Sequence, residues 1–168
     1  MENIIKLSKD DILRFEIVTS DGEKTGNDLK FDLGDIELPL KYQELLDKDE
    51  KNKKNLRNQL LIIEKRQDVK GKKLLSKNQE DEIKAIQEFF KKETEVYNMF
   101  LGDNGVQKLL NGRKFTWTTL NEIDELIVNQ ILPHLDLSMT KIQEKVKEKY
   151  GQAVARNKEV LKADEWLS

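Results

Sequence analysis

Aspartate and glycine crowd the stretch FEIVTSDGEKTGNDLKFDLGDIELPL (residues 15–40), as they do in many metal-binding and active-site loops. A calcium loop needs oxygen ligands spaced as D-x-[DN]-x-[DN]-G. Asp21 lacks that spacing, and so do the later acidic residues, Asp32, Asp35 and Glu37. These residues are better interpreted as turn formers between strands, and we expect neither a metal site nor a cofactor.

Other residues that could do chemistry lack the partners their chemistry requires. The single histidine, His134, could join only carboxylates at a transition metal, because the chain has no cysteine. No second histidine is present for a Ser-His-Asp triad, and no serine lies in a G-x-S-x-G motif. The segments KGKKLLS and GVQKLLNGRK lack the spacing of a P-loop. We therefore predict a protein that is not an enzyme and has no catalytic residues.

The stretch 15–40 also alternates apolar and polar residues, as strands of a β-hairpin do. One set precedes an interval rich in Gly and Asp and the other follows it: Phe15, Ile17 and Thr19, then Leu29, Phe31 and Leu33. The alternation resumes at Ile36, Leu38 and Leu40. The pattern predicts up to three short strands, or two strands and an extended lead into a helix.

Helical periodicity dominates the rest of the chain. Pro39 suits the first turn of a long helix that we expect to reach about Asp68, although the apolar-free run DKDEKNKKN leaves open a break into two helices. VKGKKLLSKN is a predicted loop, and residues 79–101 form the clearest helix, with Gly102 at its C-terminal cap. VQKLLNG predicts a further short helix.

The segment FTWTTLNEIDELIVNQILP predicts an unusually apolar helix. Thr119 and Glu122 have the spacing of a capping box, and Pro133 marks the expected end. Its apolar residues cover more than one stripe, so this helix either lies centrally in the core or covers two partners. Phe115 and Trp117 either anchor an interface or close the end of the helical bundle. Ser138 is the expected cap of the last helix.

Charge is distributed unevenly along the 168 residues. Residues 1–50 carry 7 Lys/Arg against 14 Asp/Glu, net −7, whereas residues 51–77 carry 10 against 2, net +8. The two segments could pair within one chain or between chains. The basic segment could also bind nucleic acid, but it has no aromatic residue for base stacking.

No apolar run approaches the length of a membrane span, and the start MENIIKLSKDD has no signal-peptide core. We expect a soluble, intracellular protein. The predicted fold class is α+β, mainly α, with a small N-terminal β-hairpin or sheet followed by a bundle of four to five helices. The predicted divisions are a β element at 1–38, a helical core at 39–135, and a C-terminal helix and tail at 136–168, all in one domain.

The run EFFKKETEVYNMFLGDNGVQKLLNGRKFTWTTLNEIDELIVNQILPHL resembles the tail assembly chaperones of phages and phage-like particles from Gram-positive hosts. In that pattern an aromatic-containing helix ends at a Gly-bounded turn, here Phe100 to Asp103. A short helix then ends at a second Gly step, here Gly112, and an apolar helix of about four turns follows. The resemblance is clearest over 85–135 and looser over 15–68.

The resemblance implies a non-enzymatic protein of the bacterial cytoplasm. Such chaperones coat the tape-measure protein, keep it soluble and are displaced by tail-tube subunits. The implied partners are thus the tape-measure and tube proteins, with no membrane. Two alternatives stay open: a structural tail or baseplate subunit retained in the particle, and a nucleic-acid-binding helical module.

Two sets of residues follow as candidate contacts. The expected partner-binding set comprises Phe100, Leu101, Phe115, Trp117, Leu120, Ile123, Leu126, Ile127 and Ile131. The expected self-association set comprises Lys53, Lys54 and Arg57, through which a basic helix would dock weakly on the acidic β element of a second copy.

Overall fold

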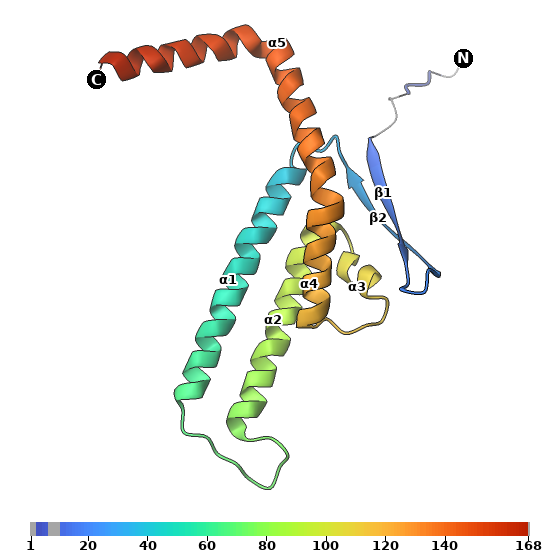
Figure 1. Cartoon of the computed structure of the whole chain (residues 1–168), viewed down its shortest axis with the longest axis vertical. Helices are drawn as coiled ribbons and strands as arrows, with labels where there is room; N and C mark the ends of the chain where they lie inside the picture. The colour runs from blue at the N-terminus through green and yellow to red at the C-terminus, as the bar shows by residue number, and fades with distance from the viewer. Residues whose placement is uncertain (1–2, 7–10, 168) are drawn as a thin grey trace. The chain divides into compact units, whose positions relative to one another are not determined.

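The computed structural model describes residues 3–6 and 11–167, and for residues 152–167 it describes the backbone alone (Figure 1). By its internal contacts the chain divides into two units, residues 1–125 and 126–168.

A two-stranded antiparallel sheet begins the first unit. Strand β1 (Ile12–Val18) pairs with β2 (Lys24–Asp32), and the register places Phe15 opposite Leu29. The connecting turn has Gly22 at a φ of +83°, a conformation that residues with a side chain rarely adopt. The predicted hairpin is therefore confirmed, with one irregularity in the register between Glu16 and Val18.

A third strand at 36–40 is not formed. The amide of Glu37 donates to the carboxylate of Asp35 at 2.9 Å, and the amide of Leu38 donates to the carbonyl of Asp35 at 3.2 Å. These bonds turn the chain directly into helix α1 (Leu38–Lys65), which has Pro39 in its first turn as predicted. The alternation at 36–40 was misleading because Asp35 accepts the backbone amides that a strand would need for pairing.

Helix α1 is continuous, so the charged run DKDEKNKKN is a solvated part of one helix and not a break. Two ion pairs, each between residues one helical turn apart, support this part of the helix. They join Lys48 to Glu44 at 2.8 Å and Lys53 to Asp49 at 2.9 Å. A loop then leads to helix α2 (Lys77–Leu101), which lies antiparallel beside α1 (Figure 1). Both the loop and the helix were predicted from the sequence.

Phe100 is the point where the sheet meets the helices. Its ring lies 5.6 Å from the ring of Phe31 on β2 and 5.5 Å from that of Tyr42 on α1. Gly102 caps α2, and the short helix α3 (Gly105–Leu110) follows. A side chain at Gly105 would place its Cβ 2.6 Å from that of Leu101, so the return of the chain onto α2 requires glycine.

Helix α4 (Trp117–Leu126) begins earlier than the sequence suggested. The predicted capping box of Thr119 with Glu122 is wrong, because Thr119 caps with Thr116 instead. The Thr116 amide donates to the Thr119 hydroxyl at 2.8 Å, and the Thr119 amide donates to the Thr116 hydroxyl at 3.3 Å. Thr116 can act as the N-terminal cap because both Thr116 and Thr119 carry a hydroxyl that accepts a backbone amide.

The second unit also corrects two predicted boundaries. A π-helical turn (Ile127–Ile131) leads into α5 (Leu132–Leu167), so no helix ends at Pro133, and Ser138 lies inside α5 and is not its cap. Proline in a helix removes a donor and crowds the preceding turn. Here that preceding turn is widened, with the Leu132 amide bonded to the Ile127 carbonyl, and this accommodates the proline.

The fold is α+β and mainly α, as predicted: in the described residues a two-stranded sheet precedes five α-helices and one π-helical turn. No helix in the described part of the chain is long and apolar enough to cross a membrane.

The cap of α4 is open to a direct test. We expect Thr119→Ala to lower the free energy of unfolding by about 1–2 kcal/mol, because the Thr116 amide loses the hydroxyl of the buried Thr119 as its acceptor. Thr118→Ala, at an exposed neighbouring position, is the control and should change it by less than about 0.5 kcal/mol. Urea unfolding followed by circular dichroism measures both, and equal effects would contradict the assigned cap.

Candidate functional site

Three aromatic residues form a surface where the start of α4 meets the middle of α2. The Trp117 ring lies 4.8 Å from that of Phe90, and Phe90 lies 5.1 Å from Phe115. Phe89, buried beneath them, lies 5.1 Å from Trp117. Trp117 nevertheless leaves 47% of its surface exposed. We call Phe90, Phe115 and Trp117 the aromatic surface.

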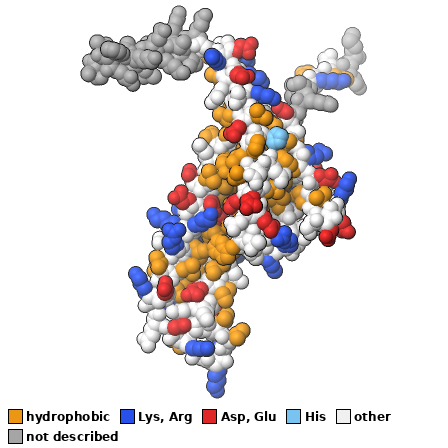
Figure 2. Space-filling view, in the orientation of Figure 1, with side chains coloured by type: hydrophobic (Ala, Val, Ile, Leu, Met, Phe, Trp, Pro, Cys, Tyr) orange, Lys and Arg blue, Asp and Glu red, His pale blue; other side chains and the backbone are white. Residues whose placement is uncertain are grey.

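The aromatic surface extends along α2. Ile83 and Ile86 precede Phe90 by two turns and one turn on the same helical face, and Ile83 is exposed while Ile86 is half-buried. Figure 2 shows one face of the molecule, on which hydrophobic side chains reach the surface among scattered Lys, Arg, Asp and Glu side chains. An apolar strip with a charged surround is the surface that an amphipathic helix can bind.

Most of the predicted partner-binding residues lie elsewhere. Six of the nine are buried, namely Phe100, Leu101, Leu120, Ile123, Ile127 and Ile131. Phe115 and Leu126 are half-buried, which leaves Trp117 as the exposed member. In this structure a partner can therefore contact Trp117 and the edge of Phe115 without any rearrangement of the chain.

Phe90 was not among the predicted site residues, although the sequence carries a signal for it. Phe89 and Phe90 are adjacent on a helix, so their side chains point about 100° apart. One of them must therefore lie at the margin of the core, and the structure shows that this is Phe90, because Phe89 is buried.

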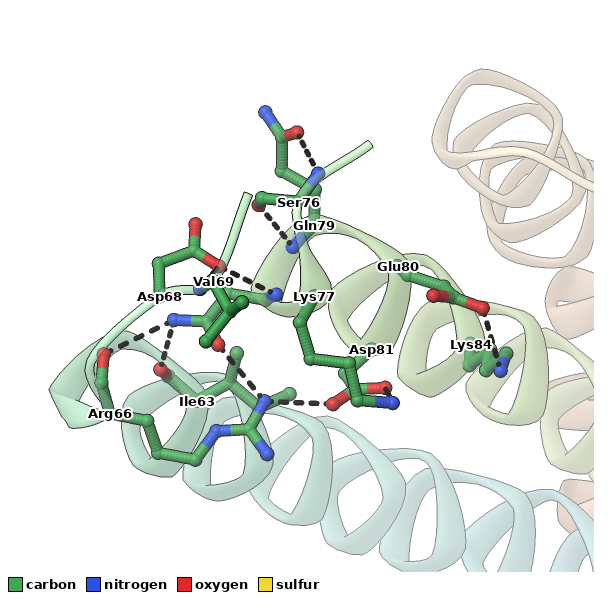
Figure 3. Close-up of polar contacts among 11 residues, drawn as sticks. Ile63, Arg66, Asp68, Val69, Ser76, Lys77, Gln79, Glu80, Asp81 and Lys84 are labelled. Carbon is green, nitrogen blue, oxygen red and sulfur yellow. Dashed lines mark hydrogen bonds and ion pairs between the residues drawn. The ribbon is translucent and has the colours of Figure 1, made fainter. Parts of the chain in front are cut away.

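The loop between α1 and α2 is closed at its base by side-chain hydrogen bonds (Figure 3). The side-chain amide of Asn78 donates to the backbone carbonyls of Ile63 at 3.0 Å and Arg66 at 3.2 Å. The Asp68 carboxylate accepts from the backbone amides of Val69 at 2.8 Å and Asn78 at 3.0 Å. Hydrogen bonds from Ser76 and Asn78 hold the pKa of Asp68 below its ordinary value. These hydrogen bonds thus join the two ends of the loop, at the end of α1 and the start of α2.

Ionic contacts join the two sides of this base. Arg66 reaches across from the end of α1 to Asp81 on α2 at 2.8 Å, and Lys77 reaches the same carboxylate at 3.2 Å. Hydrogen bonds from Arg66 and then Lys77 lower the pKa of Asp81. Ser76 begins α2 with a complete capping box to Gln79. The closed base holds an exposed segment that includes three lysines and a leucine, Lys70, Lys72, Lys73 and Leu74.

The three predicted self-association residues are all exposed on α1, but they are not equivalent. Lys53 pairs with Asp49 of its own helix at 2.9 Å. Lys54 and Arg57 lie in the basic segment and form no ion pair with another described residue. A change at Lys53 therefore disturbs an internal contact, whereas Lys54 and Arg57 test the surface.

A buried polar group was missed by the sequence reasoning. Glu93 is 0% exposed and accepts a hydrogen bond from Asn52 of α1 at 2.9 Å. Tyr97, one turn later, donates to Asp124 of α4. The signal was present: Glu93 falls on the same helical stripe as Phe89, Val96 and Phe100, where a charged residue is unexpected.

Within the described residues no group of His, Asp and Glu side chains could hold a metal ion. Comparison with known proteins finds no matching family model, no matching curated protein and no matching solved structure. The proposal of function therefore depends on the surfaces described above and on the resemblance noted in the sequence.

The closed base of the loop gives a second test. We expect Asn78→Ala to destabilise the chain by about 1 kcal/mol, because the carbonyls of Ile63 and Arg66 lose their donor. Hydrogen exchange of the Lys77 amide, which donates to the Val69 carbonyl at 3.0 Å, should also become faster. Gln87→Ala, at an exposed position on α2, is the control. Unchanged exchange in Asn78→Ala would show that the base does not depend on this residue.

Proposed function

We propose that this chain is a non-enzymatic tail assembly chaperone, which binds a phage tape-measure protein in the bacterial cytoplasm and is displaced by tail-tube subunits. The resemblance over residues 85–135 supports this function. The structural observation that carries it is the aromatic surface, where Trp117 stays 47% exposed although Phe90 packs against it at 4.8 Å. Exposed tryptophan in an apolar surround is a common anchor of protein interfaces.

The chemistry of this surface fits a long helical partner. A tape-measure helix would place one apolar stripe along Ile83, Ile86 and the aromatic surface. Charged groups border it, including the exposed ion pair between Arg113 and Glu122 at 3.2 Å. Exposed charge pairs add little affinity, so the complex would be reversible, as displacement by tube subunits requires.

Two other functions compete with this proposal. A structural tail or baseplate subunit would remain in purified particles, whereas a chaperone would be absent from them. A nucleic-acid-binding module would use the lysines of residues 51–77, where no aromatic residue is available to stack on a base. Binding of nucleic acid that falls steeply with salt would favour that third function.

The partner contact can be tested by co-expression with a tape-measure protein. We expect the wild type to raise the partner's soluble yield and to co-purify with it. Trp117→Ala combined with Phe115→Ala should weaken the complex at least about tenfold, because truncating an interface anchor costs about 1–2 kcal/mol or more.

Ile36→Ala is the matched control, since Ile36 is also apolar and exposed but lies between β2 and α1. The control should bind as the wild type does. No gain in partner solubility with the wild type would refute the chaperone proposal, and equal binding by the double variant would refute this site.

Self-association forms a separate prediction. If the basic segment of one copy docks on the acidic β element of another, oligomers present at low salt should dissociate at about 0.5–1 M salt, where the Debye length is only a few ångströms. Lys54→Glu with Arg57→Glu should dissociate them at low salt and leave the circular dichroism unchanged. Lys53 is left intact because it pairs with Asp49 inside the chain.

Sedimentation velocity decides this prediction. Lys91→Glu with Lys114→Glu, two exposed lysines outside residues 51–77, is the control for the change in net charge and should leave the oligomers intact. A monomer at every salt concentration, or an oligomer indifferent to Lys54→Glu with Arg57→Glu, would rule out the docking of β element on basic helix.

A further inference from the structure

Two buried carboxylate oxygens lack a hydrogen-bond partner in the described part of the chain. They are Oε2 of Glu93 on α2 and Oδ1 of Asp49 on α1. The other oxygen of each residue is satisfied. Oε1 of Glu93 accepts from Asn52 at 2.9 Å, and Oδ2 of Asp49 pairs with Lys53 at 2.9 Å. The two unsatisfied atoms thus belong to side chains that face each other across the α1–α2 interface.

Two ionised carboxylates cannot satisfy each other, because each can only accept a hydrogen bond. One proton changes this, since a protonated carboxyl donates one bond and the remaining carboxylate accepts it. We propose that Asp49 and Glu93 form a buried proton-binding site, in which Glu93 carries the proton on Oε2 and donates a hydrogen bond from it to Oδ1 of Asp49. A single proton then satisfies both of the unsatisfied oxygens.

The surrounding charges favour the same arrangement. Among the described residues, the titratable groups that interact with Glu93 are Asp49 and Lys53 on α1 and Tyr97 on α2, and Asp124 on α4 interacts with all three of these. Three carboxyl groups there face one ammonium group, so full ionisation would leave two uncompensated negative charges in a buried region. A proton on Glu93 reduces that excess to one. Asp49 and Asp124 stay ionised, and Asp124 accepts a hydrogen bond from the Tyr97 hydroxyl.

The expected protonation states agree with this geometry. Burial raises the pKa of Glu93 to about 8, and Asp49 adds to the rise, whereas Asn52 and Lys53 oppose it. Burial also raises the pKa of Tyr97, with Asp124 acting in the same direction, so this hydroxyl stays a donor. Burial lowers the pKa of Lys53, but its hydrogen bond and charge interaction with Asp49 outweigh that effect and raise it overall.

The site links the packing of α1, α2 and α4 to pH. The native chain keeps the proton up to about pH 8, whereas an unfolded chain releases it near the ordinary value of 4.5. The native state therefore binds more protons than the unfolded state between those values. The contribution to stability is complete below pH 4.5, falls as the pH rises and is lost above about 8.

The experiment is urea unfolding of the full chain at pH 6, 7 and 8. The sequence has one histidine and no cysteine, so few other groups ordinarily titrate in this range. In the wild type the unfolding equilibrium constant should rise up to about tenfold for each pH unit, which is the effect of one proton. Glu93→Gln should abolish most of that rise, because its amide can donate permanently to Asp49.

Glu95→Gln is the matched control, since Glu95 lies two residues further along α2 and is exposed. It should keep the pH dependence of the wild type. A Glu93→Gln variant with the same pH dependence as the wild type would overturn the proposal.

Carbon-13 NMR of the carboxyl groups gives a second measurement, and its wild-type titration does not depend on a variant that folds. One glutamate carboxyl should titrate with a midpoint near 8, and Asp49→Asn should move that midpoint down, because the asparagine amide donates to ionised Glu93. If every glutamate carboxyl of the wild type titrates below pH 6, the shared proton does not exist.

Discussion

The antiparallel pairing of α1 with α2 is the contact on which the first unit depends. The sheet reaches the helices through Phe31 against Phe100 of α2, and α4 reaches them through Trp117 against Phe89 and Phe90. Each of these contacts is made on α2, which is itself held in place by α1. The closed base of the connecting loop sets where the two helices begin to run side by side.

This pairing buries an acidic residue, Glu93, among apolar side chains of α2. A helix stripe made of Phe89, Val96 and Phe100 would pack with less electrostatic cost if residue 93 were also apolar. Glu93 instead needs a partner on α1 for each of its two oxygens, and Asn52 donates a hydrogen bond to one of them. A buried polar contact of this kind penalises other registers of the two helices, because a slipped register would leave more unsatisfied groups.

The functional surfaces are the parts of the fold that the pairing leaves uncovered. A two-helix hairpin has a limited interior, so apolar residues such as Ile83 remain exposed beside the buried ones. The aromatic surface lies where α4 covers only part of α2. The proposed chaperone function uses this incomplete coverage, since a helical partner would bury what the chain leaves exposed.

The sequence by itself determined the fold class, the hairpin turn, the long charged helix with Pro39 in its first turn, and the cap at Gly102. These features follow from local rules, such as two-residue and helical periodicity or the permitted φ of glycine, and they need no knowledge of distant residues. The predicted boundaries at Thr119 and Pro133 were wrong for different reasons. At α4 two threonines one turn apart both offered a cap, and before Pro133 a π-helical turn accommodates the proline inside the helix. Only tertiary structure decided which apolar residues were left exposed and that Glu93 was buried against Asp49. Burial depends on what packs over a residue from elsewhere in the chain, so the helical stripe marks Glu93 as unusual but does not tell what covers it.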